Sequence, residues 1–158
     1  MTPADGRFPP DVARLLLDAG WFPGRDVSAE VDAWLIRDAG KLEGLTLSPA
    51  ARTFLVEFGG LTVPQFGPRG GLGGFASSYL PQPDAAPLGR SAAFQEWYDV
   101  AVFPVGWNDD DAELAIDDRG RLFFLHWSDE FLVGDSPDAG LIALIRGHEW
   151  PSVDPARL

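Results

Sequence analysis

One stretch decides the fold class of this chain: Glu113-Leu114-Ala115-Ile116-Asp117-Asp118-Arg119-Gly120-Arg121-Leu122-Phe123-Phe124-Leu125-His126. Residues 113–117 and 121–126 are two short runs rich in apolar residues, and Asp118-Arg119-Gly120 between them is typical of a tight turn. In the second run, Leu122 and Phe124 would lie on one face of a strand, with Phe123 and Leu125 on the other. The sequence therefore predicts an antiparallel β-hairpin.

Three short helices are predicted before this hairpin, over residues 10–20, 28–40 and 48–60. Pro10 suits a first helical position, Ser48 suits an N-cap, and glycines stand at all three predicted ends. The residues expected to face the core recur at helical spacing: Val12, Leu15, Leu16, Ala19, Val31, Trp34, Leu35, Ala51, Phe54, Leu55 and Phe58.

The rest of the chain predicts further strands and two more helices. A helix that opens at Ser91 is expected to turn Phe94, Trp97 and Tyr98 inward, and a last helix runs from a Ser136 cap to glycine 147. The glycine-rich segment 67–74 is expected to be a flexible loop and residues 151–158 a loose tail. The predicted strands are 61–63, 75–80, 102–107 and 131–133.

This order of elements predicts one α+β domain, with N-terminal helices packed on a mostly antiparallel sheet and a C-terminal helix. The 158 residues, 46% of them hydrophobic, are enough to build the core of one domain. Residues 1–11 do not resemble a signal peptide, and no apolar run approaches the roughly 20 residues of a membrane helix. We therefore expect a cytoplasmic protein that does not bind membranes.

The net charge is strongly acidic and unevenly distributed. Twelve basic and 24 acidic residues give −12 with both histidines neutral. Residues 1–90 hold 10 acids and 8 bases, a net of −2, whereas residues 91–158 hold 14 acids and 4 bases, a net of −10. Such a surface repels phosphate and attracts basic proteins, so nucleic acid is not an expected partner. The acidic half is either a solvated face or a face that binds a basic partner.

The sequence contains no convincing catalytic or cofactor-binding motif. The absence of cysteine excludes thiolate chemistry, and His126 and His148 lack metal-ligand spacing. Residues 109–117 imitate the alternating carboxylates of a calcium loop, but its turn glycine and bidentate glutamate are missing. Residues 71–76 fit G-x-G-x-x-A without a following helix, and a G-x-S-x-G elbow is absent. We therefore expect no enzyme activity, no metal and no cofactor.

The candidate binding residues flank the predicted hairpin. An aromatic side chain, Trp107, stands beside Asp109-Asp110-Asp111 and Glu113 on the loop that leads into the hairpin, and could anchor a partner whose Arg or Lys residues pair with these acids. In the alternative interpretation, the tryptophan packs in the core and the aspartates solvate a turn. A second acidic pair, Asp129 and Glu130, lies beside Trp127. The candidate set is Trp107, Asp109, Asp110, Asp111, Glu113, Asp129 and Glu130.

Several short motifs follow one another in a characteristic order. They are Phe8-Pro9-Pro10-Asp11-Val12, Ala19-Gly20-Trp21, Ala50-Ala51-Arg52, Phe58-Gly59-Gly60-Leu61, Phe103-Pro104-Val105-Gly106, Gly120-Arg121-Leu122-Phe123 and Leu132-Val133-Gly134-Asp135. In this order they resemble the SUKH-3 immunity proteins, a branch of the SMI1/KNR4-like superfamily. The resemblance divides the chain into an extension, 1–7, a SUKH-3-like domain, 8–147, and a tail, 148–158. Within the domain, residues 65–90 show no resemblance to the family.

The resemblance implies a non-catalytic α+β domain that neutralises toxin domains of bacterial polymorphic-toxin systems, many of which are nucleases or nucleic-acid deaminases. The charge agrees with this, because an acidic inhibitor can occupy the basic surface of such a toxin by mimicking phosphate. Some members of the superfamily serve as general protein-interaction modules. The alternative function is therefore a non-catalytic interaction or regulatory module with an unknown partner.

Overall fold

The computed structural model describes residues 6–67, 69, 71–81, 89–147 and 149–158. The helices are α1 (Pro10–Ala19), α2 (Ser28–Arg37), α3 (Pro49–Phe58), α4 (Arg90–Tyr98), α5 (Pro137–Arg146) and the 3₁₀ helix η1 (Pro155–Arg157). The strands are β1 (Thr62–Phe66), β2 (Leu72–Ser78), β3 (Val102–Asn108), β4 (Ala112–Asp117), β5 (Leu122–His126) and β6 (Glu130–Gly134). None of the helices in these ranges has the length and apolar composition needed to cross a membrane.

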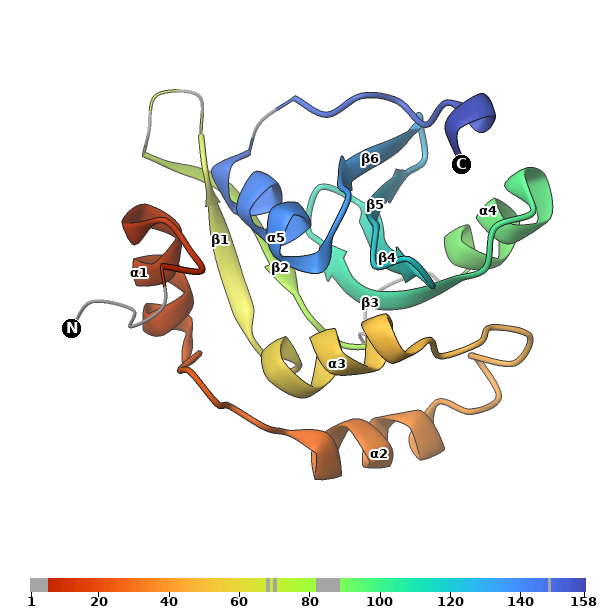
Figure 1. Cartoon of the computed structure of the whole chain (residues 1–158), viewed down its shortest axis with the longest axis horizontal. Helices are drawn as coiled ribbons and strands as arrows, with labels where there is room; N and C mark the ends of the chain where they lie inside the picture. The colour runs from red at the N-terminus through yellow and green to blue at the C-terminus, as the bar shows by residue number, and fades with distance from the viewer. Residues whose placement is uncertain (1–5, 68, 70, 82–88, 148) are drawn as a thin grey trace.

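The six strands form one sheet in chain order, and every neighbouring pair is antiparallel. The predicted hairpin is its centre, where Ala115 of β4 pairs with Phe123 of β5 and Glu113 pairs with Leu125. Figure 1 shows the sheet curling around α5, with α4 outside the curl. The predicted α+β class, antiparallel sheet and C-terminal helix are confirmed.

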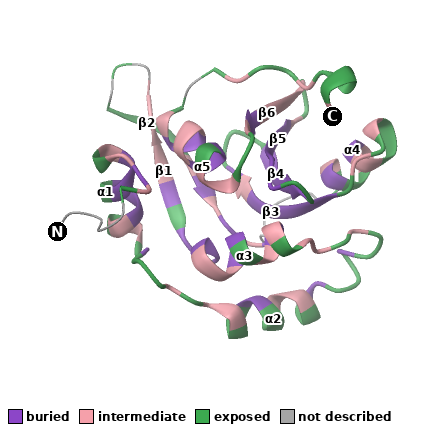
Figure 2. Cartoon of the chain, in the orientation of Figure 1, coloured by how far each residue is buried: buried purple, intermediate pink, exposed green. Residues whose placement is uncertain are grey.

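The inner face of the sheet carries the larger core. Leu114, Ile116, Leu122 and Phe124 of the central hairpin belong to one buried cluster with the apolar faces of α1, α3 and α5. The helix α2 packs on α3 and forms an outer layer, so most of its length is exposed (Figure 2). Its regular helix ends at Arg37, three residues before the expected glycine.

Two predicted helix signals around α3 are confirmed. The hydroxyl of Ser48 accepts a hydrogen bond from the backbone N–H of Ala51 at 3.2 Å. Beyond the helix, Gly60 has φ +84°, a left-handed conformation that favours glycine. These signals fix where the helix begins and where the chain turns into β1.

The outer face of the sheet carries a smaller core beneath α4. Phe94 of α4 packs on Phe123 of β5, with ring centroids 5.0 Å apart, and on Tyr98 at 4.7 Å. The expected inward position of Phe94 is confirmed, but that of Trp97 is wrong, because its side chain is 68% exposed. Ser91, Phe94 and Tyr98 form the stripe that faces the sheet, which leaves Trp97 at its margin.

Two segments expected to be irregular are in fact ordered by pairing. Residues 72–74 belong to β2, whose Leu72 pairs with Phe66 of β1, so only part of the glycine-rich segment lies outside the sheet. The tail is not loose either: the backbone N–H of Leu132 donates to the carbonyl of Pro151 at 3.0 Å, and that of Val153 donates to Glu130 at 2.9 Å. The chain after α5 therefore continues alongside β6.

Candidate partner-binding site

Two acidic turns lie side by side at one end of the sheet. Residues 109–111 join β3 to β4, and residues 127–129 join β5 to β6. Because Asn108 pairs with Ala112 and Ala112 pairs with His126, the two turns leave from neighbouring strand ends. The structure thus brings together two acidic groups that are well separated in the sequence. We refer to residues 109–111 and 127–130 as the acidic end.

The three aspartates of the first turn are exposed, but they differ in their contacts. Asp109 fastens the turn to β2, since its carboxylate accepts from the backbone N–H of Ala76 at 2.8 Å and its own N–H donates to the Ala76 carbonyl at 3.0 Å. Asp111, at φ +60°, faces the guanidinium of Arg90 with an N···O distance of 3.6 Å. The carboxylate of Asp110 has no hydrogen bond or ion pair with the described part of the chain, so it is available to a partner.

Asp129 of the second turn and Glu130, the first residue of β6, are half-buried and hold the tail and α4. The carboxylate of Asp129 accepts from the hydroxyl of Ser152 at 2.5 Å and from the backbone N–H of Glu130 at 2.8 Å. The carboxylate of Glu130 accepts from the Tyr98 hydroxyl at 3.3 Å. Burial and the neighbouring charge of Glu130 raise the pKa of Tyr98, which keeps this hydroxyl protonated as a donor.

Trp107 and Glu113 are cross-strand neighbours on the outer face, in one row with Leu125 and Glu130. Trp107 is half-buried. Trp107 lies in β3 and Glu113 in β4, so their expected position on the loop before the hairpin is wrong. Glu113 is only 2% exposed. Its carboxylate accepts from the backbone N–H of Ser91 at 2.6 Å and from the Ser91 hydroxyl.

Glu113 acts as a cap for α4 from a neighbouring strand. The helix begins after Gly89, which has no side chain to cap it, and the Glu113 carboxylate takes one of the unpaired N–H groups of the first turn. Burial raises the pKa of Glu113, and the hydrogen bonds from Ser91 partly offset this. The residue therefore positions α4 beside the acidic end.

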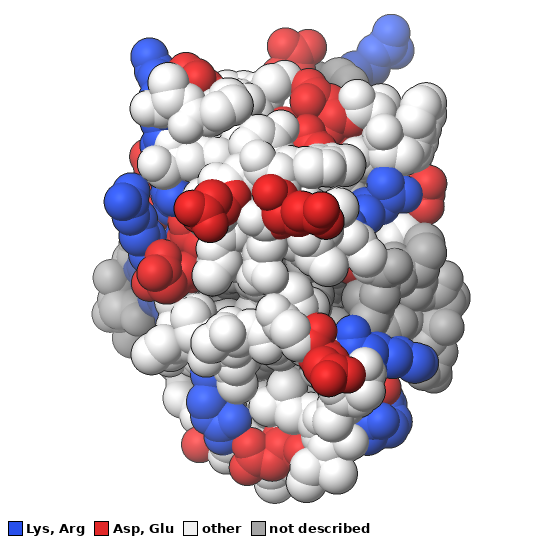
Figure 3. Space-filling model, turned by 90° about the vertical axis from the view of Figure 1, so that its right-hand side faces the viewer, with Lys and Arg blue, Asp and Glu red and all other residues white. Residues whose placement is uncertain are grey.

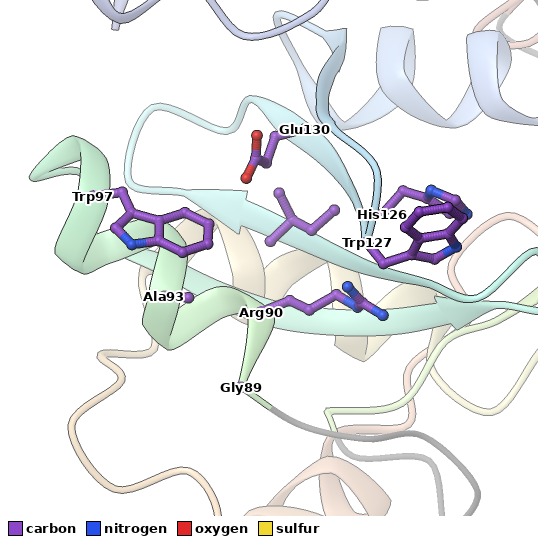
Figure 4. A pocket seen from close by; sticks show the side chains of 8 residues that line it. Gly89, Arg90, Ala93, Trp97, His126, Trp127 and Glu130 are labelled. Atoms are coloured by element: carbon purple, nitrogen blue, oxygen red, sulfur yellow. The ribbon is translucent and has the colours of Figure 1, made fainter.

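A groove runs between α4 and the β5–β6 turn, on the outer side of the acidic end. It has a volume of about 330 Å³ and is lined by residues that include Ala93 and Leu125. Figure 4 shows Trp97 and Trp127 at opposite ends of the groove, with Arg90 and Glu130 on opposite sides between them. The two tryptophans are 68% and 70% exposed. We refer to this site as the outer groove.

The exposure of these two tryptophans is the unusual feature. Among the described residues, the other four tryptophans are buried or half-buried. Large aromatic side chains left in water at the rim of a groove are typical of protein-binding surfaces, where tryptophan is enriched among the residues that dominate affinity. The sequence indicated Trp127 as a candidate but not Trp97, because helical spacing predicted that this side chain faces the core.

A family model described as SUKH-3 immunity protein matches residues 8–147. This chain belongs to the SUKH-3 immunity protein family. No curated protein and no solved structure matches it. Family membership indicates an immunity function against a toxin, and proteins of this family are generally non-catalytic.

In this SUKH-3 protein the acidic side chains of the α4 side do not form one continuous patch. Figure 3 shows that they gather in several separate groups among uncharged residues, with Lys and Arg mostly toward the margins. In the described ranges, no group of three or more His, Asp or Glu side chains is placed to hold a metal ion. His126 is engaged locally, since its Nδ1 lies 2.7 Å from the hydroxyl of Ser128. The groove thus offers aromatic rings, an apolar lining and one charge of each sign.

Proposed function

We propose that this protein is an immunity protein that binds and neutralises a basic toxin domain, of the nuclease or nucleic-acid deaminase type, in the bacterial cytoplasm. The toxin is bound without catalysis, through the outer groove and the acidic end. Membership of the SUKH-3 family supports the class of function. The observation that carries the location is the pair of exposed tryptophans, Trp97 and Trp127, at the two ends of one groove.

The physical reason is that the outer groove has the composition of an interface centre. A tryptophan covered by a partner removes a large apolar area from water at little cost in side-chain entropy, and truncation of such a residue typically costs about 2 kcal/mol or more of binding free energy. Arg90 and Glu130 between the rings can orient a partner through charge pairs. The buried cap from Glu113 keeps α4, and with it Trp97, in place.

The charge of the protein supports the choice of a basic toxin. The net charge of −12, with −10 in residues 91–158, attracts a positively charged protein and accelerates encounter with it. Enzymes that act on nucleic acid present basic surfaces to phosphate. A protein that covers such a surface with carboxylates competes with the substrate directly, so inhibition needs no chemical step.

The test is whether this protein protects cells from the product of the gene next to its own, scored as growth when the two are co-expressed. The wild type should protect, and purified Trp97→Ala/Trp127→Ala protein should bind the toxin at least about 30-fold more weakly with an unchanged Tm. Ile36→Ala is the matched control, since Ile36 is 80% exposed on α2, away from the groove.

Each outcome of this test has a definite meaning. A wild type that neither protects nor binds would overturn the proposed function. Full binding by the double tryptophan variant would move the interface away from the outer groove. Specific binding to a different, non-toxin protein would favour the interaction-module alternative.

A further inference from the structure

A second hollow lies on the inner side of the acidic end, separated from the outer groove by the β5–β6 turn. It has a volume of about 460 Å³ and brings together residues from β2, β5, β6 and the tail. Its walls include four aromatic side chains and two carboxylates: Phe75, Phe124, Phe131, Trp150, Asp110 and Glu149. We refer to this site as the inner pocket.

Three of the rings form a packed wall. The centroids of Phe124 and Trp150 are 4.8 Å apart, those of Phe124 and Phe131 are 6.2 Å apart, and those of Phe131 and Trp150 are 6.3 Å apart. Phe75, from β2, is 39% exposed and also lines the pocket. Phe124 is buried in the core and Phe131 and Trp150 are half-buried, so the ring surface that remains accessible in the pocket is that of Phe75, Phe131 and Trp150.

The charges around this wall are of one sign. Asp110 and Glu149 are exposed, and neither carboxylate has a hydrogen bond or an ion pair with the described part of the chain. The described residues that line the inner pocket include no Lys or Arg, whereas the outer groove contains Arg90. Aromatic faces with free carboxylates beside them attract a cation through the ring quadrupole and through direct charge pairing.

We propose that the inner pocket receives the side chain of one Lys or Arg residue of the toxin, an inference that rests on the proposed function. The aliphatic stem of that side chain packs on the rings of Phe75 and Trp150, and its charged end lies between Asp110 and Glu149. Pockets that enclose small ligands have volumes of roughly 300–1,000 Å³, so the space suffices for such a side chain together with its own backbone. The toxin is thereby held on both sides of the β5–β6 turn.

The first experiment needs no toxin. N-acetyl-arginine amide is titrated into the ¹⁵N-labelled protein, and the indole N–H signal of Trp150, assigned by its loss in Trp150→Phe, is followed by NMR. The signal should shift in a saturable way. N-acetyl-citrulline amide, which has the same shape without the charge, should leave it unchanged. Equal shifts with the arginine and citrulline compounds would overturn the inference. The absence of a shift with both the arginine compound and its lysine analogue would also overturn it.

Variants locate the binding energy. Asp110→Asn/Glu149→Gln should weaken binding of the arginine compound at least about fivefold, since it removes both charge pairs. Asp118→Asn/Asp135→Asn removes two exposed acids elsewhere and should have no effect. Phe75→Ala should also weaken binding, whereas Leu72→Ala, an exposed residue of the same strand that does not line the pocket, should not. Binding that tolerates both sets of pocket variants contradicts the inference.

Measurements of toxin binding distinguish a failure of this inference from a failure of the proposed function on which it rests. Asp110→Asn/Glu149→Gln should weaken toxin binding about tenfold, which corresponds to roughly 1.4 kcal/mol. If the wild type protects and this variant binds the toxin equally well, the inference is wrong and the proposed function stands. If the arginine compound binds as expected but the wild type binds no toxin, the pocket binds cations and the proposed function fails.

Discussion

The two ends of β4 carry acidic turns of opposite character. At one end Asp117 is completely buried, and its carboxylate accepts from the backbone N–H groups of Arg119 and Arg121 at 3.1 and 2.8 Å and from the Arg121 side chain at 2.7 Å. At the other end Asp109, Asp110 and Asp111 are exposed. Among the described residues, Asp111 forms the ion pair of this turn, with Arg90 at an N···O distance of 3.6 Å.

The difference shows that the donors around a carboxylate decide whether it serves the fold or the surface. At the Asp117 end, Gly120 at φ +84° closes a tight turn, and the first proline of α5 packs against that glycine. The turn therefore points its N–H groups at one enclosed carboxylate. At the acidic end the carboxylates point into water, with hollows on both sides of the β5–β6 turn.

The largest effect should come from the enclosed turn. Asp117→Ala leaves the largely buried Arg121 guanidinium without a carboxylate to balance its charge, and should lower the free energy of unfolding by about 3–5 kcal/mol. Urea unfolding of the variant beside Asp118→Ala, an exposed neighbour expected to be neutral, measures this. Similar stabilities for the two variants would show that the enclosed carboxylate of Asp117 contributes no more to folding than an exposed one.

Neutralising the exposed aspartates of the acidic end should slow association with the toxin and should change the stability of the protein little. Asp109→Asn/Asp110→Asn/Asp111→Asn should leave the Tm nearly unchanged, because asparagine keeps the acceptor used by Ala76 and tolerates the left-handed position at 111. Association with the toxin should slow several-fold at low salt, where steering between opposite charges is screened least.

Stopped-flow association over a range of salt concentrations tests that expectation. The rates of the wild type and of the triple variant should converge as added salt shortens the screening length from about 10 Å toward 3 Å. Equal rates at low salt would show that these aspartates do not steer the partner. In that case the acidic pair Asp129 and Glu130 is the next set to neutralise.

The smallest effect concerns Glu113, a buried acid close to the exposed ones. Its raised pKa means that the folded state binds this proton more tightly than the unfolded state does. Its contribution to stability is therefore present at low pH and declines as pH rises above the ordinary Glu range. The free energy of unfolding of the wild type relative to Glu113→Gln should fall as the pH rises from the ordinary Glu pKa of about 4.3. A constant difference as the pH rises would contradict the burial of a charged group there.

Much of the fold could be predicted because local signals agree with the tertiary structure. The alternating residues of 122–125 are buried on both faces of the central hairpin, and Ser48 and Gly60 mark the limits of α3 and its turn. The prediction that Trp97 faces inward was wrong because helical spacing does not show how much of the surface of α4 is covered by the sheet. The glycines of β2 have a low propensity for strands, so the sequence does not predict a strand there. The strand forms because these residues pair with β1.

The candidate site was harder to predict, since its parts meet only through strand pairing. The two acidic turns are 16 or more residues apart in sequence and become neighbours because β4 pairs with β5. All six residues of β4, Glu113 among them, are buried, so both faces of this strand are covered. The apolar residues that follow Glu113 in the strand were the available signal for its burial. The inner pocket depends on Trp150, in a tail whose sequence carries no strand signal of its own.

The pairing of the tail with β6 matters for anyone who shortens this protein. The family match ends at Gly147, yet the carbonyl of Pro151 and the N–H of Val153 satisfy main-chain groups of Leu132 and Glu130. A chain cut at the family boundary would expose a bare edge strand, which is a template for pairing with other copies and for aggregation. A soluble recombinant domain should therefore extend beyond Val153.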